Sequence, residues 1–264
     1  PSSIDLAFKK CKKEKRPALL TYTVSGDPSK KKSLEILKTI SKNADIIELG
    51  FAHNTPIADG GEIQNSAYRA IKNGTKLNDT FKIVKQFKKS KNAKPLILMG
   101  YWNLVLQYGQ DKFIKKCKQS DVNGLIIVDL PYPENKKFSG VCKKNGIIFI
   151  QFLSPTTSYN RMIKIVKDSH MLYYISMLST TGGKLKVSPK IILKNYKKIK
   201  NLEKNKNCVI GFGITSKNIS SFKKADGCVV GSEICKKISE SMKKRQNPVT
   251  NVASMVKKLK GKII

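Results

Sequence analysis

Short apolar runs recur along the whole of this 264-residue chain, and their spacing constrains its fold more than any other feature. Each run is rich in β-branched residues, is too short for a core helix and is bounded by Gly, Pro, Asn or Asp, as buried strands are. The runs occupy residues 18–24, 45–49, 95–99, 124–128, 147–152, 172–176, 208–211 and 227–230. Because both faces of these strands are apolar, the pattern predicts a parallel sheet that is covered by helices.

Segments with helical periodicity lie between the expected strands. Their apolar residues share one helix face at Leu34, Leu37 and Ile40, at Phe81, Ile83, Val84 and Phe87, and at Phe113, Ile114 and Cys117. Alternation of strand and helix on this scale is typical of a closed (β/α)8 barrel of about 250 residues. An open doubly wound sheet would carry a Gly-rich dinucleotide fingerprint after its first strand, and this chain has none there. We therefore predict an α/β fold, a single (β/α)8 TIM barrel over residues 1–264, with an extra N-terminal helix at 4–13 and a C-terminal helix at 249–259.

The formal net charge of +34 raises the question of a nucleic-acid partner. Nearly all of the positive charge is lysine and is spread over every segment, whereas base readout and phosphate clamping rely on arginine. The arginines are Arg16, Arg69, Arg161 and Arg245. We therefore expect a solvated, lysine-rich surface and no specific nucleic-acid binding.

The composition also indicates where the chain works. No apolar run reaches the roughly 18 residues that span a bilayer, and residues 1–16 lack the apolar stretch of a signal peptide. The 6 cysteines form no C-x-x-C pair, and only His53 and His170 could join them in a metal site. The sequence favours a cytoplasmic protein with reduced thiols, no membrane partner and no bound metal.

Two acidic residues lie where an active site is expected. In these barrels the catalytic groups come from the C-terminal ends of the strands, and Glu48 lies near the end of the second expected strand, with Asp59 in the loop after it. Burial would favour the protonated form of Glu48 and suit it to acid–base chemistry. Simpler interpretations are that Glu48 points outward at a strand end and that Asp59 is a helix N-cap paired with Glu62. Around one mouth of the barrel, the two carboxylates could instead divide acid–base and electrostatic roles.

Glycines mark the ends of the late strands. Thr181-Gly182-Gly183 follows the sixth strand, Gly211-Phe212-Gly213 ends the seventh, and Gly231-Ser232 ends the eighth just before a helical stretch. Loops after strands seven and eight, with a short helix N-terminus, form the usual phosphate site of these barrels. Backbone N–H groups and the helix dipole attract a dianion, and glycine allows it to approach closely. The pattern therefore predicts a phosphate site.

Aromatic and apolar residues at or near the strand ends could line a slot for a flat hydrophobic substrate. They are Tyr22, Met99, Tyr101, Ile126, Tyr173 and Phe212. Most residues of this kind are simply part of a core, so the slot is one of two interpretations.

A set of motifs in a fixed order is similar to one family, the tryptophan synthase α subunit. The motifs are TVSGDP at 23–28, DIIELG at 45–50, PIADGGEIQN at 56–65, LMGYWNLV at 98–105, VDLPYP at 128–133, Thr181-Gly182, GFGI at 211–214 and Gly231-Ser232. Each motif alone is weak evidence, whereas the combination is highly specific and covers nearly the whole chain.

The resemblance implies a lyase of tryptophan biosynthesis that cleaves indole-3-glycerol phosphate to indole and glyceraldehyde 3-phosphate by a retro-aldol reaction. Glu48 matches the family's acid–base carboxylate, and Asp59 matches the carboxylate that holds the indole N–H. By the same resemblance, the phosphate would rest on Gly182, Gly211, Gly213, Gly231 and Ser232, and the indole against Tyr22, Met99, Tyr101, Ile126, Tyr173, Thr181 and Phe212. The resemblance implies no cofactor for this subunit. Pyridoxal phosphate is expected only on a β subunit that takes up the indole, in an α2β2 heterotetramer.

The loop after Glu48 departs from the family pattern. The family continues with a Pro-aromatic-Ser-Asp run where this chain has FAHNT at 51–55, and Ser179-Thr180 replaces the usual Gly-Val. His53 could substitute as a hydrogen-bonding group, but we favour the interpretation of a solvent-facing loop residue. The departure motivates one alternative, a catalytically weakened α subunit that mainly activates its β partner. A second alternative, another phosphate-binding barrel enzyme, predicts metal ligands or a catalytic lysine at the strand ends, and neither stands out.

Overall fold

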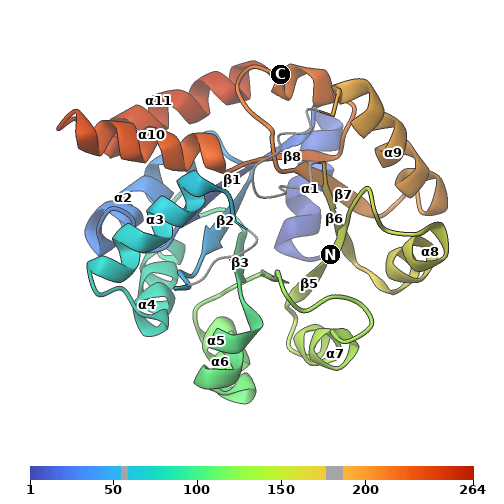
Figure 1. Ribbon diagram of the computed structural model, residues 1–264, viewed down its shortest axis with the longest axis horizontal. Coiled ribbons are helices and arrows are strands. Elements are labelled where there is room, and N and C mark those ends of the chain that lie inside the picture. The colour runs from blue at the N-terminus through green and yellow to red at the C-terminus, as the bar shows by residue number, and fades with distance from the viewer. Residues whose placement is uncertain (55–58, 177–186) are drawn as a thin grey trace.

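The strands of the computed structural model, which describes residues 1–54, 59–176 and 187–264, form one closed barrel. They pair in chain order, all in parallel, and β8 pairs with β1 (Figure 1). The strands are β1 Ala18–Val24, β2 Ile46–Gly50, β3 Leu96–Gly100, β4 Gly124–Ile127, β5 Ile148–Leu153, β6 Met171–Ile175, β7 Asn207–Gly211 and β8 Gly227–Val230. The predicted (β/α)8 barrel is confirmed, and each strand begins and ends within one residue of the apolar run that predicted it.

Helices follow the strands and surround the barrel (Figure 1). They are α1 Ser3–Lys13, α2 Lys30–Ile40, α3 Gly61–Lys72, α4 Leu77–Lys88, α5 Trp102–Tyr108, α6 Gln110–Gln119, α7 Lys136–Lys144, α8 Tyr159–Asp168, α9 Pro189–Leu202, α10 Ser232–Lys243 and α11 Pro248–Gly261. A short 3-10 helix, η1 Ile219–Phe222, lies between β7 and β8. The helices predicted before the first strand and after the last are confirmed as α1 and α11.

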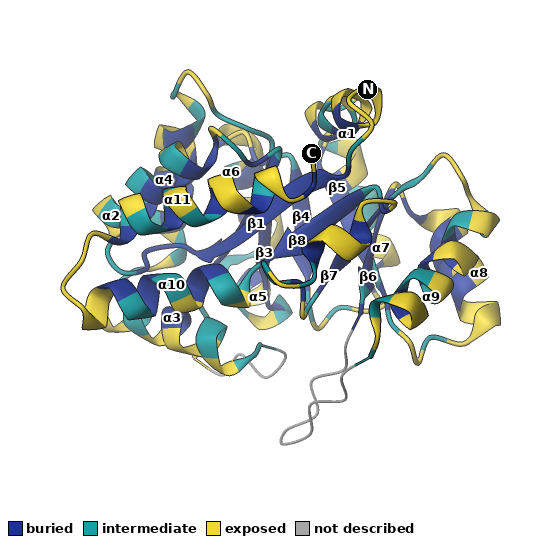
Figure 2. Cartoon of the chain, turned by 90° about the horizontal axis from the view of Figure 1, so that it is seen from above, coloured by how far each residue is buried: buried dark blue, intermediate teal, exposed yellow. Residues whose placement is uncertain are grey.

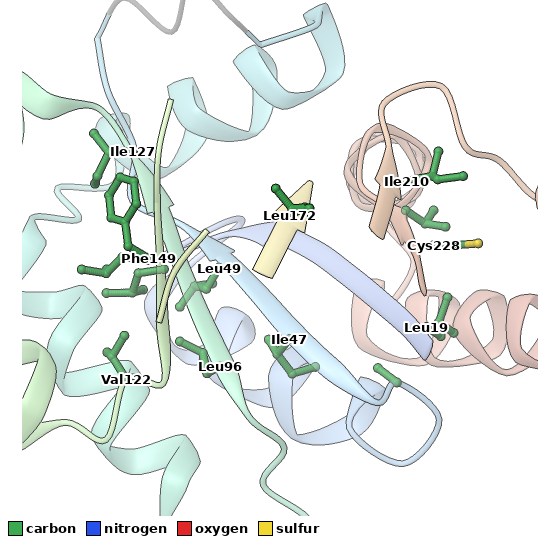
Figure 3. Close-up of a cluster of buried hydrophobic side chains, with 14 of the residues drawn as sticks. Leu19, Ile47, Leu49, Leu96, Val122, Ile127, Phe149, Leu172, Ile210 and Cys228 are labelled. Carbon is green, nitrogen blue, oxygen red and sulfur yellow. The ribbon is translucent and has the colours of Figure 1, made fainter. Parts of the chain in front are cut away.

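The side chains of each strand alternate between two apolar cores, because successive side chains of a strand point to opposite faces. The outward side chains, among them Leu19, Ile47 and Leu172, pack against the helices (Figure 3). The helix faces predicted from periodicity belong to this outer core, although Leu34 is only partly buried. Figure 2 shows the result, with helices buried on the side toward the strands and exposed on the other.

The inward side chains form the second core, which fills the barrel. Ile46, Ile97 and Val209 belong to it, and so do Ile4 and Phe8 of α1. Helix α1 therefore closes the barrel at the N-terminal ends of the strands, and the space for a ligand lies at the opposite end.

A partly buried ion-pair network stabilises that closed end. Asp45, just before β2, accepts hydrogen bonds from Arg16 at 2.8 and 2.9 Å and from the backbone N–H of Leu19 at 2.8 Å. Lys260 of α11 reaches the same carboxylate at 2.8 Å. The network ties the segment after α1, two strands and the last helix together.

None of the helices in the described ranges is long and apolar enough to cross a membrane. The 6 cysteines are free and buried. Burial raises the pKa of the Cys11 thiol to about 11 and that of the Cys235 thiol to about 12, so both stay protonated at neutral pH.

Candidate active site

A cavity of about 90 Å³ lies at the C-terminal ends of the strands, where catalytic groups of such barrels are expected. Its lining comes from β1, β2, β3, β6, β8 and the segments that follow β2, β7 and β8. The residues are Tyr22, Glu48, Asp59, Ile63, Met99, Tyr173, Phe212, Gly213, Ile214, Thr215, Val229, Gly231 and Ser232. The structure thus brings both predicted carboxylates and three of the predicted phosphate residues into one cavity.

Glu48 points into the barrel and is fully buried. It lies beside Tyr22 in the β1–β2 register and beside Ile97 in the β2–β3 register. Within the described part of the chain, neither of its carboxylate oxygens has a hydrogen-bond partner. Burial raises the pKa of Glu48 to about 8, because removal from water disfavours the charged form. The interpretation of Glu48 as an outward-pointing residue is therefore wrong, and the residue is a neutral acid at neutral pH.

Asp59 lies two residues before α3 and is not its cap. The N-cap of α3 is Gly60, and no side chain caps this helix end among the described residues. Instead, Oδ2 of Asp59 accepts a hydrogen bond of 3.3 Å from the Tyr101 hydroxyl. Burial raises the pKa of Asp59 to about 6, although the hydrogen bond from Tyr101 acts to lower it. At neutral pH Asp59 is therefore mostly ionised while Glu48 is mostly protonated.

Two glycines make room for the tyrosines of the site. A Cβ atom on Gly50 would lie 2.1 Å from the Tyr22 hydroxyl oxygen, and one on Gly211 would lie 1.9 Å from that of Tyr173. Gly211 was predicted to bind phosphate, but it lies against the Tyr173 ring and does not line the cavity. A glycine is needed at position 211 because any side chain there would collide with the Tyr173 ring.

The aromatic residues form one wall of the site. The Tyr173 ring packs edge-on against Phe212 at 6.0 Å and against Phe152 at 5.1 Å, measured between ring centroids. Burial holds the pKa of Tyr173 well above its usual value, so its hydroxyl remains a proton-bearing donor. Tyr101 lies in an adjoining small cavity together with Asp59, and the predicted Ile126 is buried in the barrel core without lining either cavity.

Several lining residues escaped the sequence-based prediction. Ile63 follows Asp59 in the first turn of α3, and Val229 precedes Gly231 on the inward face of β8. The spacing of two residues between Val229 and Gly231 is a signal that could have placed both on one face of the strand. Thr215 lies in an irregular loop, and no local pattern marks it.

Two segments form the other end of the cavity. The first, after β7, has left-handed backbone, and the second is the start of helix α10. Phe212 and Gly213 have φ values of 65° and 73°. Gly231 precedes the first turn of α10, and Ser232 begins this helix of 12 residues. Free N–H groups at a helix N-terminus attract anions, so Gly213, Gly231 and Ser232 suit a phosphate group. Gly182 and Thr181 lie outside the described residues.

The described part of the loop after β2 packs on the site. His53 is half-buried, and its ring centroid lies 4.9 Å from that of Tyr101. This contact corrects the interpretation of His53 as a solvent-facing residue. Thr55 and Pro56 of the same loop lie outside the described residues.

Asp27, from the first sequence motif, orients an arginine that connects α3 with α10. It is buried and accepts hydrogen bonds of 2.7 and 3.0 Å from Arg69 of α3. The same guanidinium donates to Ser239 of α10 at 2.8 Å. The last turn of α3 is thus held against α10. Within the described ranges, no group of three His, Cys, Asp or Glu side chains is placed to hold a metal ion.

The known proteins that are similar to this chain belong to one family. The sequence profile of the family "Tryptophan synthase alpha chain" matches residues 8–263. The tryptophan synthase alpha chain of Pelagibacter ubique (strain HTCC1062) is 70% identical over 263 residues, which are 99% of each chain. The crystal structure of tryptophan synthase subunit alpha from Legionella pneumophila str. Paris has a TM-score of 0.91 at 30% identity, covering 100% of this chain and 98% of that one. The chain belongs to the tryptophan synthase alpha chain family.

Proposed function

We propose that Glu48 and Asp59 carry out the cleavage of indole-3-glycerol phosphate to indole and glyceraldehyde 3-phosphate, the lyase reaction of this family in tryptophan biosynthesis. The observation that carries the proposal is the pairing of a neutral buried acid with an ionised carboxylate in one cavity. Two carboxylates whose surroundings set different protonation states can take the acid and the electrostatic role. Residues 1–264 would act as a single catalytic domain.

Glu48 starts the reaction as an acid. It gives its proton to the indole carbon that bears the glycerol phosphate chain, and the ring becomes an indolenine cation. The Glu48 carboxylate then takes the proton of the hydroxyl on the adjacent carbon. As that oxygen forms a carbonyl, the C–C bond breaks and its electron pair returns to the ring. Indole and glyceraldehyde 3-phosphate are released from a Glu48 that carries its proton again.

Asp59 supports the charged intermediate. As an ionised carboxylate it accepts a hydrogen bond from the indole N–H and offsets the positive charge that develops on the ring. The Tyr101 hydroxyl, which donates to Asp59, holds this carboxylate in place. Tyr22, Met99, Tyr173 and Phe212 supply the apolar surface for the indole, and Ile63 and Val229 extend it.

The phosphate end of the substrate would lie at Gly213, Gly231 and Ser232. These residues offer backbone N–H groups and the positive end of the α10 dipole, and Gly213 and Ser232 are exposed at the cavity mouth. Gly182 and Thr181, which the resemblance adds to the substrate site, are proposed on the family pattern alone. The fixed distance between this end and Glu48 would align the C–C bond of the substrate with the acid.

The half-reaction is proposed to need no metal or organic cofactor on this chain, because the proton transfers use only Glu48 and the charge is offset by Asp59. A β subunit carrying pyridoxal phosphate is the proposed partner, in an α2β2 assembly that uses the released indole in the cytoplasm. The loop that starts at Phe51 lies between the two carboxylates in the sequence, so contact with a partner there would affect how they are aimed.

The test is indole release by the full chain incubated with indole-3-glycerol phosphate, with and without the β subunit of the same source. Asp59→Asn should lower kcat by roughly 10²–10³-fold, as loss of one preorganised electrostatic contact does. Asp111→Asn, on the exposed surface of α6, is the matched control and should leave kcat unchanged. Equal turnover in both variants would show that Asp59 has no part in the reaction.

A further inference from the structure

Ser216, in the loop after β7, is held by side chains from two other elements. Its backbone N–H and its hydroxyl donate to Oε2 and Oε1 of Glu233, each at 2.6 Å. Lys262, the C-cap residue of α11, donates to its carbonyl oxygen. Ser216 directly follows Thr215 of the cavity lining, and Glu233 directly follows Ser232. One carboxylate thus joins the two segments that form the phosphate end of the cavity.

Hydrogen bonds also connect the loop around Ser216 to Gly213, which lines the cavity. The backbone N–H of Thr215 donates to Oδ1 of Asn218 at 2.8 Å, and Nδ2 of Asn218 donates to the carbonyl oxygen of Gly213 at 2.8 Å. Residues 213–218 are therefore linked to one another by hydrogen bonds. Fixing Ser216 against α10 also fixes Gly213 relative to Gly231.

The negative charge of Glu233 cannot itself favour phosphate binding, so any contribution of this residue must come from the geometry of its contacts. An acidic residue in the first turn of a helix is favourable for the helix itself. Next to a phosphate dianion, however, the same charge is repulsive. A carboxylate here can support phosphate binding only through the two contacts that it makes, which use both of its oxygens on a single serine.

We infer that Glu233 is a positioning residue of the phosphate site, which sets the spacing between the loop after β7 and the start of α10 through its two hydrogen bonds to Ser216. The inference rests on the proposed function, because it assumes that phosphate binds between Gly213 and Gly231. It assigns to Glu233 an effect on affinity for the phosphate end of the substrate and none on the proton transfers at Glu48.

Two substitutions separate geometry from charge. Glu233→Ala removes both contacts and the charge. Glu233→Gln removes only the charge, since its amide oxygen can accept from the Ser216 N–H and its amide N–H can donate to the Ser216 hydroxyl. We expect Glu233→Ala to raise the Kd for glyceraldehyde 3-phosphate and the KM for indole-3-glycerol phosphate by roughly 10-fold, as loss of charge-assisted hydrogen bonds does. For Glu233→Gln we expect a Kd equal to or below that of the unaltered chain.

Further variants distinguish a local effect on phosphate affinity from misfolding of the chain. Ser216→Ala removes one of the two contacts and should give an intermediate Kd, and combining it with Glu233→Ala should add nothing, because both act through one interaction. Glu240→Ala removes an acid of the same helix that pairs with Lys237, and should leave the Kd unchanged. Indole affinity, measured for every variant, should stay constant because indole does not reach the phosphate end.

The experiment is a titration of each full-length variant with glyceraldehyde 3-phosphate and with glyceraldehyde, together with steady-state kinetics on indole-3-glycerol phosphate. An unchanged Kd in Glu233→Ala, or a Kd that falls in both Glu233 variants alike, would overturn the positioning role while leaving the phosphate site intact. If the unaltered chain binds glyceraldehyde 3-phosphate no better than glyceraldehyde, the phosphate site itself is misplaced and the inference falls with it.

Discussion

The Tyr101 hydroxyl donates a hydrogen bond of 3.3 Å to Oδ2 of Asp59, and so connects the residue after β3 to the loop that leads into α3. This contact lowers the pKa of Asp59 while burial raises it, and the balance leaves the pKa at about 6. Glu48, in the same cavity, has no such donor among the described residues, and burial raises its pKa to about 8. The different roles proposed for the two carboxylates depend on this difference.

The first prediction concerns the pH dependence of turnover. The reaction needs Asp59 ionised, which holds above a pH of about 6, and Glu48 protonated, which holds below a pH of about 8. The profile of kcat/KM against pH should therefore be bell-shaped, with its maximum between these two values. Activity that keeps rising beyond pH 9 would contradict a protonated Glu48 as the starting acid.

The second prediction concerns Tyr101→Phe. Removing the hydroxyl removes a hydrogen bond that favours the ionised form of Asp59, so the pKa of Asp59 should rise and the acidic limb of the profile should move to higher pH. Tyr108→Phe, which removes a hydroxyl that donates to Asn78 away from the cavity, is the matched control. An acidic limb that stays in place in Tyr101→Phe would mean that this contact does not set the ionisation of Asp59.

The third prediction concerns Gly211. Gly211→Ala places a Cβ where the Tyr173 hydroxyl lies, so the ring must move into the cavity or the strand must shift. We expect at least a 10-fold loss of kcat/KM and a loss of stability of about 1–3 kcal/mol, as overpacking typically causes. Gly140→Ala, where an added Cβ meets nothing within 4 Å, is the control and should keep full activity. Normal kinetics in Gly211→Ala would show that Tyr173 need not hold this position.

Most of the barrel could be predicted from the sequence, whereas much of the site could not. The strands were predictable because each is apolar on both faces, but for the same reason the sequence did not indicate which side chains point inward. The direction of Glu48 follows from barrel closure. Asp59 resembled an N-cap because its neighbours fit a capping pattern, and the contact with Tyr101 joins residues far apart in the chain.

Two further features, Gly211 and the contact between Glu233 and Ser216, could not be predicted for the same reason. Gly211 fitted the phosphate pattern, yet its partner is a tyrosine on the neighbouring strand, which local sequence does not identify. The contact between Glu233 and Ser216 joins the first turn of α10 to the loop after β7 and leaves no periodic signal. The features that escaped prediction are contacts between loops and between strand ends, which depend on how the barrel closes.

The fourth prediction concerns the partner. Ala52 stands where the family usually has a proline, so the segment 51–54 should be looser in the free chain. Thr55 stands where the family usually has an aspartate, so fewer charge-assisted contacts to a partner are expected. We expect low activity of the chain alone, activation by the β subunit of the same source, and weaker activation by a β subunit whose own α partner has the usual loop. Indole release titrated against each β subunit is the measurement. Full activity without a partner, or equal activation by both, would point to a stand-alone lyase.

The last prediction joins stability and activity at Glu48, and its measurement tests the central claim. Since burial raises the pKa of Glu48 in the folded chain to about 8, above its value of about 4.5 when unfolded, the folded state binds the proton more tightly and stability falls as pH rises between these values. Glu48→Gln removes this dependence and should stabilise the chain at pH 8 by up to about 4 kcal/mol in urea unfolding.

The same variant should lose turnover. Glu48→Gln keeps the size of the side chain but cannot give or take the proton, so kcat should fall by at least roughly 10²–10⁴-fold with little change in KM. Glu35→Gln, on the surface of α2, should behave as the unaltered chain does. The decisive measurement is indole release from indole-3-glycerol phosphate by Glu48→Gln: a folded, more stable and nearly inactive variant is the predicted result, and a variant with near-normal turnover would contradict the assignment of Glu48 as the acid–base group.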